Sequence, residues 1–518
     1  MNSDYDFIVV GAGIAGLRAA IELNQHGSVL CLAKRELTES NTQYAQGGIA
    51  VALAPDDSPE LHLRDTIAAG AGLVNEEAAR VLVTEGPERV LELLHWGVQF
   101  DCDEQGDLAF TREGAHSRNR VLHAGGDSTG REIGRALHRH ATRLENIHLE
   151  AFGFTRDLLL QDGRVAGLEI LQEDGGTRRV TSRAVLLATG GAGMVFANTT
   201  NPEVATADGA AMAWRAGAEL SDMEFVQFHP TALYLAGAPR FLLSEALRGE
   251  GAYLRNHAGE RFMPRYHPLA ELAPRDVVAR AIHHEVQAGP AEAMVYLDVT
   301  HLDKAKLRTR FPLISGTCLR YGLDITRELI PVRPAAHYAM GGVRTGLDGR
   351  ASLAGLYAAG EAAGSGVHGG NRLASNSLLE GLVFGMRAAR SMASESSPAR
   401  RDRSEGTAAR EPGGEQDDVP LRQEARQLME RCVGMVREAD GLAQAVARLR
   451  EIRAALPAPL DRQRAETRNI VESGLAIARA ALARQESRGG HYRSDFPQRD
   501  DARFCKHSVM CRDSVRFE

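Results

Sequence analysis

The N-terminal region carries an apolar run, a glycine-rich turn and a helical pattern in immediate succession. Residues 5–10 form an apolar β run, and residues 17–25 read as a helix. Between them lies Gly11-Ala12-Gly13-Ile14-Ala15-Gly16, and a second apolar run at 28–33 completes a βαβ unit. Glycines let the backbone approach a pyrophosphate, whose charge meets the free N–H groups of the helix N-terminus. The order therefore predicts a Rossmann-like nucleotide-binding fold. The residues expected at the cofactor are Gly11, Gly13, Ile14, Ala15 and Gly16.

The end of the second apolar run departs from the usual dinucleotide pattern. An acidic residue for a ribose hydroxyl is expected there, but the chain reads Ala33-Lys34-Arg35-Glu36. Lys34 is a candidate to cover the adenosine or a phosphate of the cofactor. A solvated lysine at the edge of a loop is the alternative.

Two later apolar runs, at 184–188 and 356–359, also end in glycine-rich turns and look like further strands of the same sheet. A polar stretch with almost no large apolar residue, and then apolar residues at helical spacing, follow residue 393. These patterns predict the α/β fold class. We expect a discontinuous nucleotide-binding domain at 1–220 and 336–393, an inserted α+β capping domain at 221–335, a linker at 394–420, and a C-terminal helical bundle with a tail at 421–518.

The amino-acid composition disfavours several classes of function. The net charge of -7 offers no general attraction for nucleic acid or an anionic membrane. Only four of the 61 basic residues are lysines, which disfavours Schiff-base chemistry and favours carboxylate binding by arginine. The six cysteines include no C-x-x-C pair, so we expect no metal site and a reducing compartment. The acidic N-terminus and the lack of an apolar run of roughly 20 residues favour a cytoplasmic protein without a membrane partner.

The C-terminal tail contains one weak metal-like pattern. Cys505, His507 and Cys511 lie close together in sequence, but their spacing matches no standard zinc site. We expect them to be residues of a disordered tail.

The segment after the βαβ unit makes the prediction more specific. Small residues, amides and paired glycines at 40–49 suit a loop laid along a flavin. With this loop, five further motifs resemble the superfamily of succinate dehydrogenases, fumarate reductases and L-aspartate oxidases. They are Ala188-Thr189-Gly190-Gly191, Gln227-Phe228-His229-Pro230-Thr231, Arg275-Asp276-Val277-Val278-Ala279-Arg280, His337-Tyr338-Ala339-Met340-Gly341-Gly342 and His368-Gly369-Gly370-Asn371-Arg372.

This resemblance implies an FAD cofactor and the residues along it. Where the membrane-complex members of the superfamily carry a histidine joined covalently to FAD, this chain has Asn41. The resemblance therefore implies non-covalent FAD. For Asp208 and Glu361, ribose binding is expected and helix capping is the alternative. The implied cofactor residues beyond the first turn are Lys34, Asn41, Thr42, Gln43, Tyr44, Ala45, Gln46, Gly47, Gly48, Asp208, Glu361, Ser377 and Leu378.

The resemblance also implies a site for a small dicarboxylate. The residues that match the carboxylate-binding positions are His229, Ser244, His337 and Arg372. Arg372 carries the most weight, because its fork of N–H donors can hold both oxygens of a carboxylate. For either histidine, a hydrogen-bonded core residue is the alternative.

Arg275 matches the arginine that exchanges a proton with the substrate opposite the hydride face. A guanidinium is a poor base unless its proton is removed quickly, and Glu245 and Arg248 offer a relay. In the alternative, the amine loses its proton before hydride transfer and Arg275 supplies only charge and position. The sequence leaves both open.

Glu113 separates the possible substrates. It lies in Thr111-Arg112-Glu113-Gly114-Ala115-His116-Ser117, which resembles the pattern of the aspartate oxidase branch, whereas the succinate and fumarate enzymes usually have an apolar residue there. A carboxylate pairs with the ammonium group that succinate lacks. A surface charge is the alternative for Glu113.

These matches together imply oxidation of L-aspartate to iminoaspartate, with hydride passing from Cα to flavin N5. Oxygen or fumarate is the expected electron acceptor. Hand-over of the unstable product to a quinolinate synthase, for NAD synthesis, is a further expectation. The rival enzyme is a fumarate reductase or succinate dehydrogenase flavoprotein, and the rival of another class is a binding protein that keeps FAD without turnover.

Overall fold

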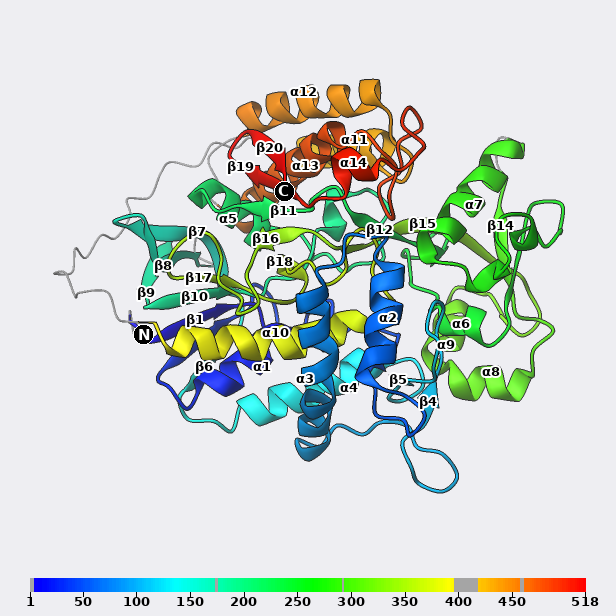
Figure 1. The fold of residues 1–518 in the computed structure, drawn as a ribbon, viewed down its shortest axis with the longest axis horizontal. Coiled ribbons are helices and arrows are strands. Elements are labelled where there is room, and N and C mark those ends of the chain that lie inside the picture. The colour runs from blue at the N-terminus through cyan, green and yellow to red at the C-terminus, as the bar shows by residue number, and fades with distance from the viewer. Residues whose placement is uncertain (1–3, 173–175, 291–292, 396–417, 457–460) are drawn as a thin grey trace.

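The computed structural model describes residues 4–172, 176–290, 293–395, 418–456 and 461–518 (Figure 1). A sheet of five parallel strands lies at its centre, in the order β17-β10-β1-β2-β6. The strands are β1 Phe7–Val10, β2 Val29–Leu32, β6 Ile147–Glu150, β10 Ala184–Leu187 and β17 Leu356–Ala358. The four predicted runs are confirmed as neighbouring strands, each shorter than its run. The edge strand β6 was not predicted.

Both faces of this sheet are buried, which explains why its strands are apolar at every position. Phe7 and Val9 face a cluster that includes Leu17, Leu137 and other side chains of the helices on that face. These helices are seen below the sheet in Figure 1. They are α1 Ile14–Leu23, α3 Glu76–His95, α4 Thr129–Ala141 and α10 Asn376–Ala393, and α2 Pro59–Ala69 packs beside α3.

The opposite face of the sheet is covered by an antiparallel three-stranded sheet and by the C-terminal helices. Ile8 and Val10 share a cluster with Leu168 and Trp214 there. The covering elements are β7 Phe154–Gln161, β8 Arg164–Leu171, β9 Thr177–Thr181 and α5 Asp208–Ala216. A small sheet next to the loop predicted to lie along the flavin comprises β3 Ile49–Ala50, β4 Phe110–Thr111 and β5 Val121–Leu122.

The segment predicted to cap the site contains an antiparallel sheet in the order β12-β15-β14-β13 and packs its own core, which includes Leu247, Ile282 and Leu297. It appears in green in Figure 1. Its elements are β12 Val226–Leu233, α6 Ala246–Gly249, β13 Tyr253–Arg255, α7 Arg275–Ala288, β14 Val295–Asp298, α8 Lys304–Arg310, α9 Pro312–Arg320 and β15 Ile330–Ala339. The predicted boundary between the capping domain and the nucleotide-binding domain, at residues 335 and 336, falls inside β15. The domain boundaries stay predictions.

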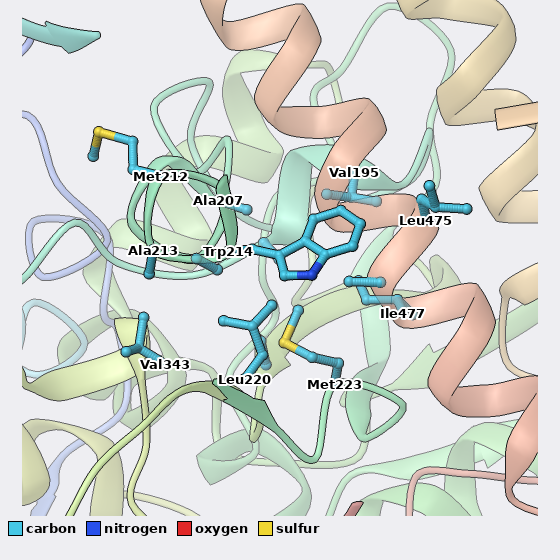
Figure 2. Close-up of a cluster of buried hydrophobic side chains, with 14 of the residues drawn as sticks. Val195, Ala207, Met212, Ala213, Trp214, Leu220, Met223, Val343, Leu475 and Ile477 are labelled. Carbon is cyan, nitrogen blue, oxygen red and sulfur yellow. The ribbon is translucent and has the colours of Figure 1, made fainter. Parts of the chain in front are cut away.

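Three C-terminal helices pack together over the central domain. They are α11 Val419–Val433, α12 Ala439–Ala455 and α13 Arg462–Ala483. Figure 2 shows Leu475 and Ile477 of α13 beside the indole of Trp214. Of the predicted linker, residues 396–417 lie outside the described residues. Within the part of the chain that the structure describes, no helix is both long and apolar enough to cross a membrane.

The tail after residue 485 is ordered, so the prediction of a disordered tail is wrong. Its strand β19 joins the sheet β18-β16-β11-β19-β20, and His507 Nδ1 lies 2.6 Å from an oxygen of Asp222. Fully buried ion pairs hold the tail, since Glu486 pairs with Arg484 at 2.9 Å and with Arg488 at 2.7 Å. The polar composition of the tail does not show that these charged residues are paired and buried. The elements are α14 Asp501–Phe504, β19 Ser508–Cys511 and β20 Ser514–Phe517, with β11 Leu220–Ser221, β16 Gly342–Arg344 and β18 Ala363–Gly364.

Candidate active site

One cavity, open to solvent, joins the glycine turn to the predicted substrate residues. Its lining runs from Gly11 and Gly13 to His229, Arg275 and Arg372. Of the predicted site residues, all but three line it. The three exceptions are Gly16, which packs behind the turn, Gln43, and Arg248, which is buried behind Glu245.

The glycine turn is shaped by close backbone contacts. Gly11 has a φ of +114°, and a Cβ there would lie 2.1 Å from the carbonyl oxygen of Ala188. A Cβ on Gly16 would lie 1.8 Å from the carbonyl oxygen of Gly11. Helix α1 begins immediately after Gly13, which offers no side chain to cap it. The N-terminus of α1 therefore presents backbone donors to the cavity, as binding of a pyrophosphate requires.

The predicted flavin loop lies along the same cavity. Ile14 N donates to Thr42 Oγ1 at 3.1 Å, which ties the loop to the start of α1. Asn41 Nδ2 donates to Glu361 Oε2 at 2.9 Å. Burial raises the pKa of Glu361 to about 7, although the Asn41 amide and the Ala339 N–H oppose the rise. The loop thus contributes amides and small side chains to the lining of the cavity. At position 41 it offers an amide and no imidazole to which a flavin could be attached.

Lys34 and Asp208 form an ion pair at one end of the cavity. Lys34 Nζ lies 2.7 Å from Asp208 and 2.9 Å from Glu466 of α13. Asn469, also on α13, donates to Asp208 at 2.7 Å. Burial opposes ionisation of Asp208, but Lys34 and the other donors hold its pKa below the usual value. The C-terminal helices therefore reach the cofactor cavity, which the sequence did not reveal.

Two arginines meet at the other end of the cavity through an amide that the sequence reasoning did not select. Gln227 Oε1 accepts from Arg275 Nη1 at 2.9 Å and from Arg372 Nη2 at 3.1 Å. Gln227 Nε2 donates to Asn371 Oδ1 and to the Arg372 carbonyl, which fixes the amide's orientation. Gln227 precedes His229 by two residues on β12, so strand alternation was the available signal.

Arg372 is held on several sides and keeps one donor free. Its Nη1 donates to Ser377 Oγ at 2.9 Å, and its Cζ lies 4.2 Å from the centroid of the Tyr338 ring. Burial, together with the charge of Arg275, lowers the pKa of Arg372 to about 10. Its Nε is buried and has no hydrogen-bond partner among the described residues. A guanidinium so placed favours an anionic ligand.

The two predicted histidines face each other. Their ring centroids lie 5.1 Å apart, and His337 Nδ1 lies 2.8 Å from Thr200 Oγ1. Burial and the nearby arginines hold the pKa of His229 and of His337 well below the ordinary value, so both rings are neutral at pH 7. His229 Nε2 is buried without a partner in the described chain. Neutral imidazoles can donate one hydrogen bond each to a bound carboxylate.

Glu113 is buried in the same cavity rather than exposed on the surface, with 3% of its area accessible. Its Oε2 accepts from Ser375 Oγ at 2.7 Å, whereas Oε1 has no partner within the described residues. Burial raises the pKa of Glu113, and the negative charge of Glu245 raises it further. One carboxylate oxygen is therefore available to a cationic ligand. Ser375 is a second residue that the sequence reasoning missed.

Arg275 contacts the buried carboxylate next to it. Arg275 Nε donates to Glu245 Oε2 at 2.5 Å, and Arg248 Nη2 lies 3.5 Å from the same oxygen. Burial alone would raise the pKa of Glu245. The positive charges of Arg275 and Arg248 have a larger effect, so the pKa of this carboxyl is lower than its usual value. Behind it, Arg248 Nη1 donates to the Glu271 carbonyl at 2.6 Å. The structure thus brings together all three residues predicted for proton transfer.

The amino-acid sequence matches two protein families. The FAD binding domain family matches residues 6–378, and the fumarate reductase flavoprotein C-terminal family matches residues 422–518. The first match confirms the predicted FAD cofactor. The cavity suits it, because the glycine turn is bare of side chains and buried polar atoms such as Gln46 Oε1 lack partners among the residues described.

Curated relatives and solved structures agree with these matches. The L-aspartate oxidase of Streptomyces coelicolor is 45% identical over 98% of this chain and 91% of its own length. L-aspartate oxidase 2-b of Nicotiana tabacum, a chloroplastic protein, is 45% identical over 96% of this chain and 82% of its own. An E. coli quinol fumarate reductase has a TM-score of 0.92 at 32% identity, covering 99% of this chain and 96% of that one. Sdh1 of Mycobacterium smegmatis has a TM-score of 0.83 at 34% identity, covering 98% and 91%. The chain therefore belongs to the L-aspartate oxidase family, within the flavoprotein superfamily that also contains the fumarate reductases.

Proposed function

We propose that this protein oxidises L-aspartate to iminoaspartate, the first step of NAD biosynthesis, with non-covalently bound FAD. The observation that carries the proposal is the unpaired Oε1 of Glu113 in the same cavity as Arg275 and Arg372. Two guanidinium groups in one cavity suit a diacid, and a buried carboxylate in the same cavity suits an ammonium group. Succinate and fumarate have no such group, so Glu113 distinguishes aspartate from them.

The two substrate carboxylates are assigned to opposite groups of donors. One carboxylate binds Arg372 and His337, and the other binds His229 and Ser244. Ser244 is buried, with 3% of its area accessible, and the residue lines the cavity. The two neutral imidazoles add donors without adding charge. Arg372 therefore supplies the formal positive charge at one carboxylate, and Arg275 supplies a second positive charge in the same cavity.

In the reaction, the Cα–H bond of aspartate breaks and its electron pair leaves as hydride, while the substrate nitrogen loses protons as the C=N bond forms. Bound FAD supplies the acceptor for that hydride. Arg275 holds the substrate opposite the hydride face, and the proton leaves through Arg275, Glu245 and Arg248. This route is supported by the hydrogen bond from Arg275 Nε to Glu245 Oε2 at 2.5 Å and by Arg248 Nη2, which lies 3.5 Å from the same oxygen. The segment at 221–335 acts as a capping domain that excludes water from the reacting atoms.

The cofactor is proposed to be removable. The position that matches the attachment histidine of the membrane-complex enzymes carries the amide of Asn41, which is not nucleophilic and donates to Glu361. The glycine turn would bind the pyrophosphate, and Lys34 and Asp208 would lie at the adenosine end. Oxygen or fumarate is proposed to take the electrons. The product would pass promptly to a quinolinate synthase because an imine hydrolyses readily, and a cytoplasmic location stays a prediction.

Anaerobic mixing of the flavin-loaded protein with L-aspartate, D-aspartate and succinate, each separately, tests this function. We expect L-aspartate alone to remove the absorbance of oxidised flavin. Bleaching by succinate but not by L-aspartate would establish the fumarate reductase alternative instead. A protein that binds FAD and is reduced by none of these acids would be a binding protein. Release of free FAD by acid precipitation tests the non-covalent attachment.

A further inference from the structure

We propose that Ser375 is a positioning residue that selects for the amino acid, because it fixes one oxygen of Glu113 and leaves the other for the substrate's ammonium group. This inference rests on the function proposed above. Ser375 is assigned no contact with the substrate. It acts through Glu113, and it belongs to none of the motifs from which the site was predicted.

The contact between the two side chains is short and enclosed. Ser375 Oγ donates to Glu113 Oε2 at 2.7 Å, and both residues are buried, with 6% and 3% of their areas accessible. A Cβ on Gly47, in the loop expected along the flavin, would lie 3.5 Å from the second oxygen, Oε1, and 3.6 Å from Ser375 Oγ. Glu113 and Ser375 both line the cavity that also contains Arg275 and Arg372. The unpaired oxygen therefore lies beside that loop, in the cavity proposed to hold the substrate.

The backbone of Ser375 supports this role, because the residue does not behave as a helix cap. Ser375 occupies the N-cap position of α10, where a serine normally caps the first turn from an extended conformation. Here φ is +61° and ψ is +6°, in the left-handed region that side chains other than glycine rarely adopt. Its hydroxyl makes no capping bond within the described helix. The hydroxyl is turned to Glu113 instead.

The two loops that carry the pair are held in register by neighbouring contacts. His116 Nε2 lies 2.9 Å from the Ala374 carbonyl oxygen, and Ala50 N donates to the Ser375 carbonyl at 3.0 Å. Arg372 precedes Ser375 by three residues on the same segment. A single segment thus places both the guanidinium for a carboxylate and the hydroxyl that orients Glu113.

The charges around Glu113 explain why the hydroxyl matters. Facing it are Glu245 and Arg248 around α6, Arg275 at the start of α7, and Arg372 before α10. Burial and Glu245 raise the pKa of Glu113, whereas Arg275, the Ser375 hydroxyl and Arg372 lower it. The hydroxyl therefore favours the ionised carboxylate that an ammonium group requires. Its removal should raise the pKa of Glu113.

Two substitutions remove the hydroxyl, and one neighbouring substitution is the control. Ser375→Ala deletes it, and Ser375→Gly deletes it while suiting the left-handed backbone, so at least one variant should fold. Ser377→Ala is the matched control, because the Ser377 hydroxyl contacts Arg372 rather than Glu113. We expect both Ser375 variants to raise KM for L-aspartate about tenfold, with the inhibition constant of succinate changed less than about twofold. Ser377→Ala should weaken both ligands alike.

Two further measurements separate positioning from a general structural role. The acid limb of kcat/KM for L-aspartate should move to higher pH in the Ser375 variants. In a Glu113→Gln background, Ser375→Ala should add no further selective effect. Equal weakening of aspartate and succinate by both Ser375 variants, or an unmoved acid limb, would overturn the inference. If Glu113→Gln is selective against aspartate and the Ser375 variants are not, only the role of Ser375 fails. If Glu113→Gln itself weakens all diacids equally, the proposed role of Glu113 fails.

Discussion

Arg275 donates a hydrogen bond from Nε to Glu245 Oε2 at 2.5 Å, and both side chains are buried at the wall of the cavity. The pair joins a guanidinium, which can pass a proton on only as it receives another, to a carboxylate, which can take that proton. Arg248 contacts the same carboxylate from behind. This relationship gives the site a route for a proton away from the substrate.

Glu245→Gln should lower kcat for L-aspartate by about 100-fold, because the amide cannot accept the proton that Arg275 passes on. The binding of succinate should change much less, because Gln still accepts from Arg275. Rapid-reaction measurement of flavin reduction under anaerobic conditions checks the rate. Glu250→Gln is the control, since Glu250 lies at the end of α6 and pairs with Lys306 at the surface. A normal rate in the Glu245 variant would exclude the relay.

Arg372→Lys should weaken every diacid, because an ammonium group cannot replace the fork of donors that also bonds Ser377 and Gln227. The expected loss is about 1.5–3 kcal/mol, or roughly 10- to 150-fold in affinity. KM for L-aspartate and the inhibition constant of succinate measure it. Arg265→Lys serves as the control, because the exposed Arg265 pairs with Glu285 away from the cavity residues. An effect on aspartate alone would contradict the assignment.

Gln227→Glu should also weaken aspartate and succinate together, by about tenfold, because a carboxylate would neutralise part of the positive charge shared by Arg275 and Arg372. It would also face two acceptors, Asn371 Oδ1 and the Arg372 carbonyl. Steady-state kinetics give KM for L-aspartate and the inhibition constant of succinate. If both constants were unchanged, the amide of Gln227 that joins Arg275 to Arg372 would have no part in binding.

Acidity should affect the two ligands differently. The pKa of Glu113 is raised, so the carboxylate is ionised above this raised pKa and loses its charge as the pH falls through it. kcat/KM for L-aspartate should therefore fall on acidification at a pH above the usual range of a glutamate. Succinate needs no carboxylate there, and its binding should persist or strengthen. Parallel pH profiles of the two constants check the prediction, and a common fall would contradict it.

Gly11→Ala should cost roughly 1–3 kcal/mol of stability through overpacking and should reduce FAD retention. The added Cβ would lie 2.1 Å from the Ala188 carbonyl, and φ is positive at this position. Thermal unfolding and flavin content after gel filtration measure the two effects. Gly316→Ala is the control, because no heavy atom of the described chain outside its own neighbours would lie within 4 Å of that Cβ. Full retention of FAD by the Gly11 variant would contradict the prediction.

The parts of the fold that follow from local pattern could be predicted from the sequence. Apolar runs buried on both faces and the turn at Gly11 identify the parallel strands and the first helix. The edge strand β6 was missed, because its sequence Ile147-His148-Leu149-Glu150 alternates and lacks a continuous apolar run. The order of the tail was missed because buried arginine–glutamate pairs resemble, in composition, a solvated segment.

The site divides in a similar way. Residues inside glycine-rich or histidine-containing motifs, such as His229 and Arg372, could be selected, and they line one cavity. Contacts between segments that are distant in sequence could not be predicted. An example is the ion pair between Lys34 and Glu466, which lie 432 positions apart. Ser375 was missed because its left-handed backbone and rotated hydroxyl leave no mark in the pattern of residue types. Gln227 lay within a recognised motif, and strand alternation with His229 could have selected it.

The central claim is that Glu113 binds the substrate's ammonium group beside the flavin. Its most direct test compares Glu113→Gln with the unchanged protein, by anaerobic reduction with L-aspartate and by the inhibition constant of succinate. We predict that the variant retains FAD, is reduced by L-aspartate with at least about tenfold lower efficiency, and binds succinate as well as before or better. Equal loss for both ligands, or no loss for L-aspartate, would contradict the claim.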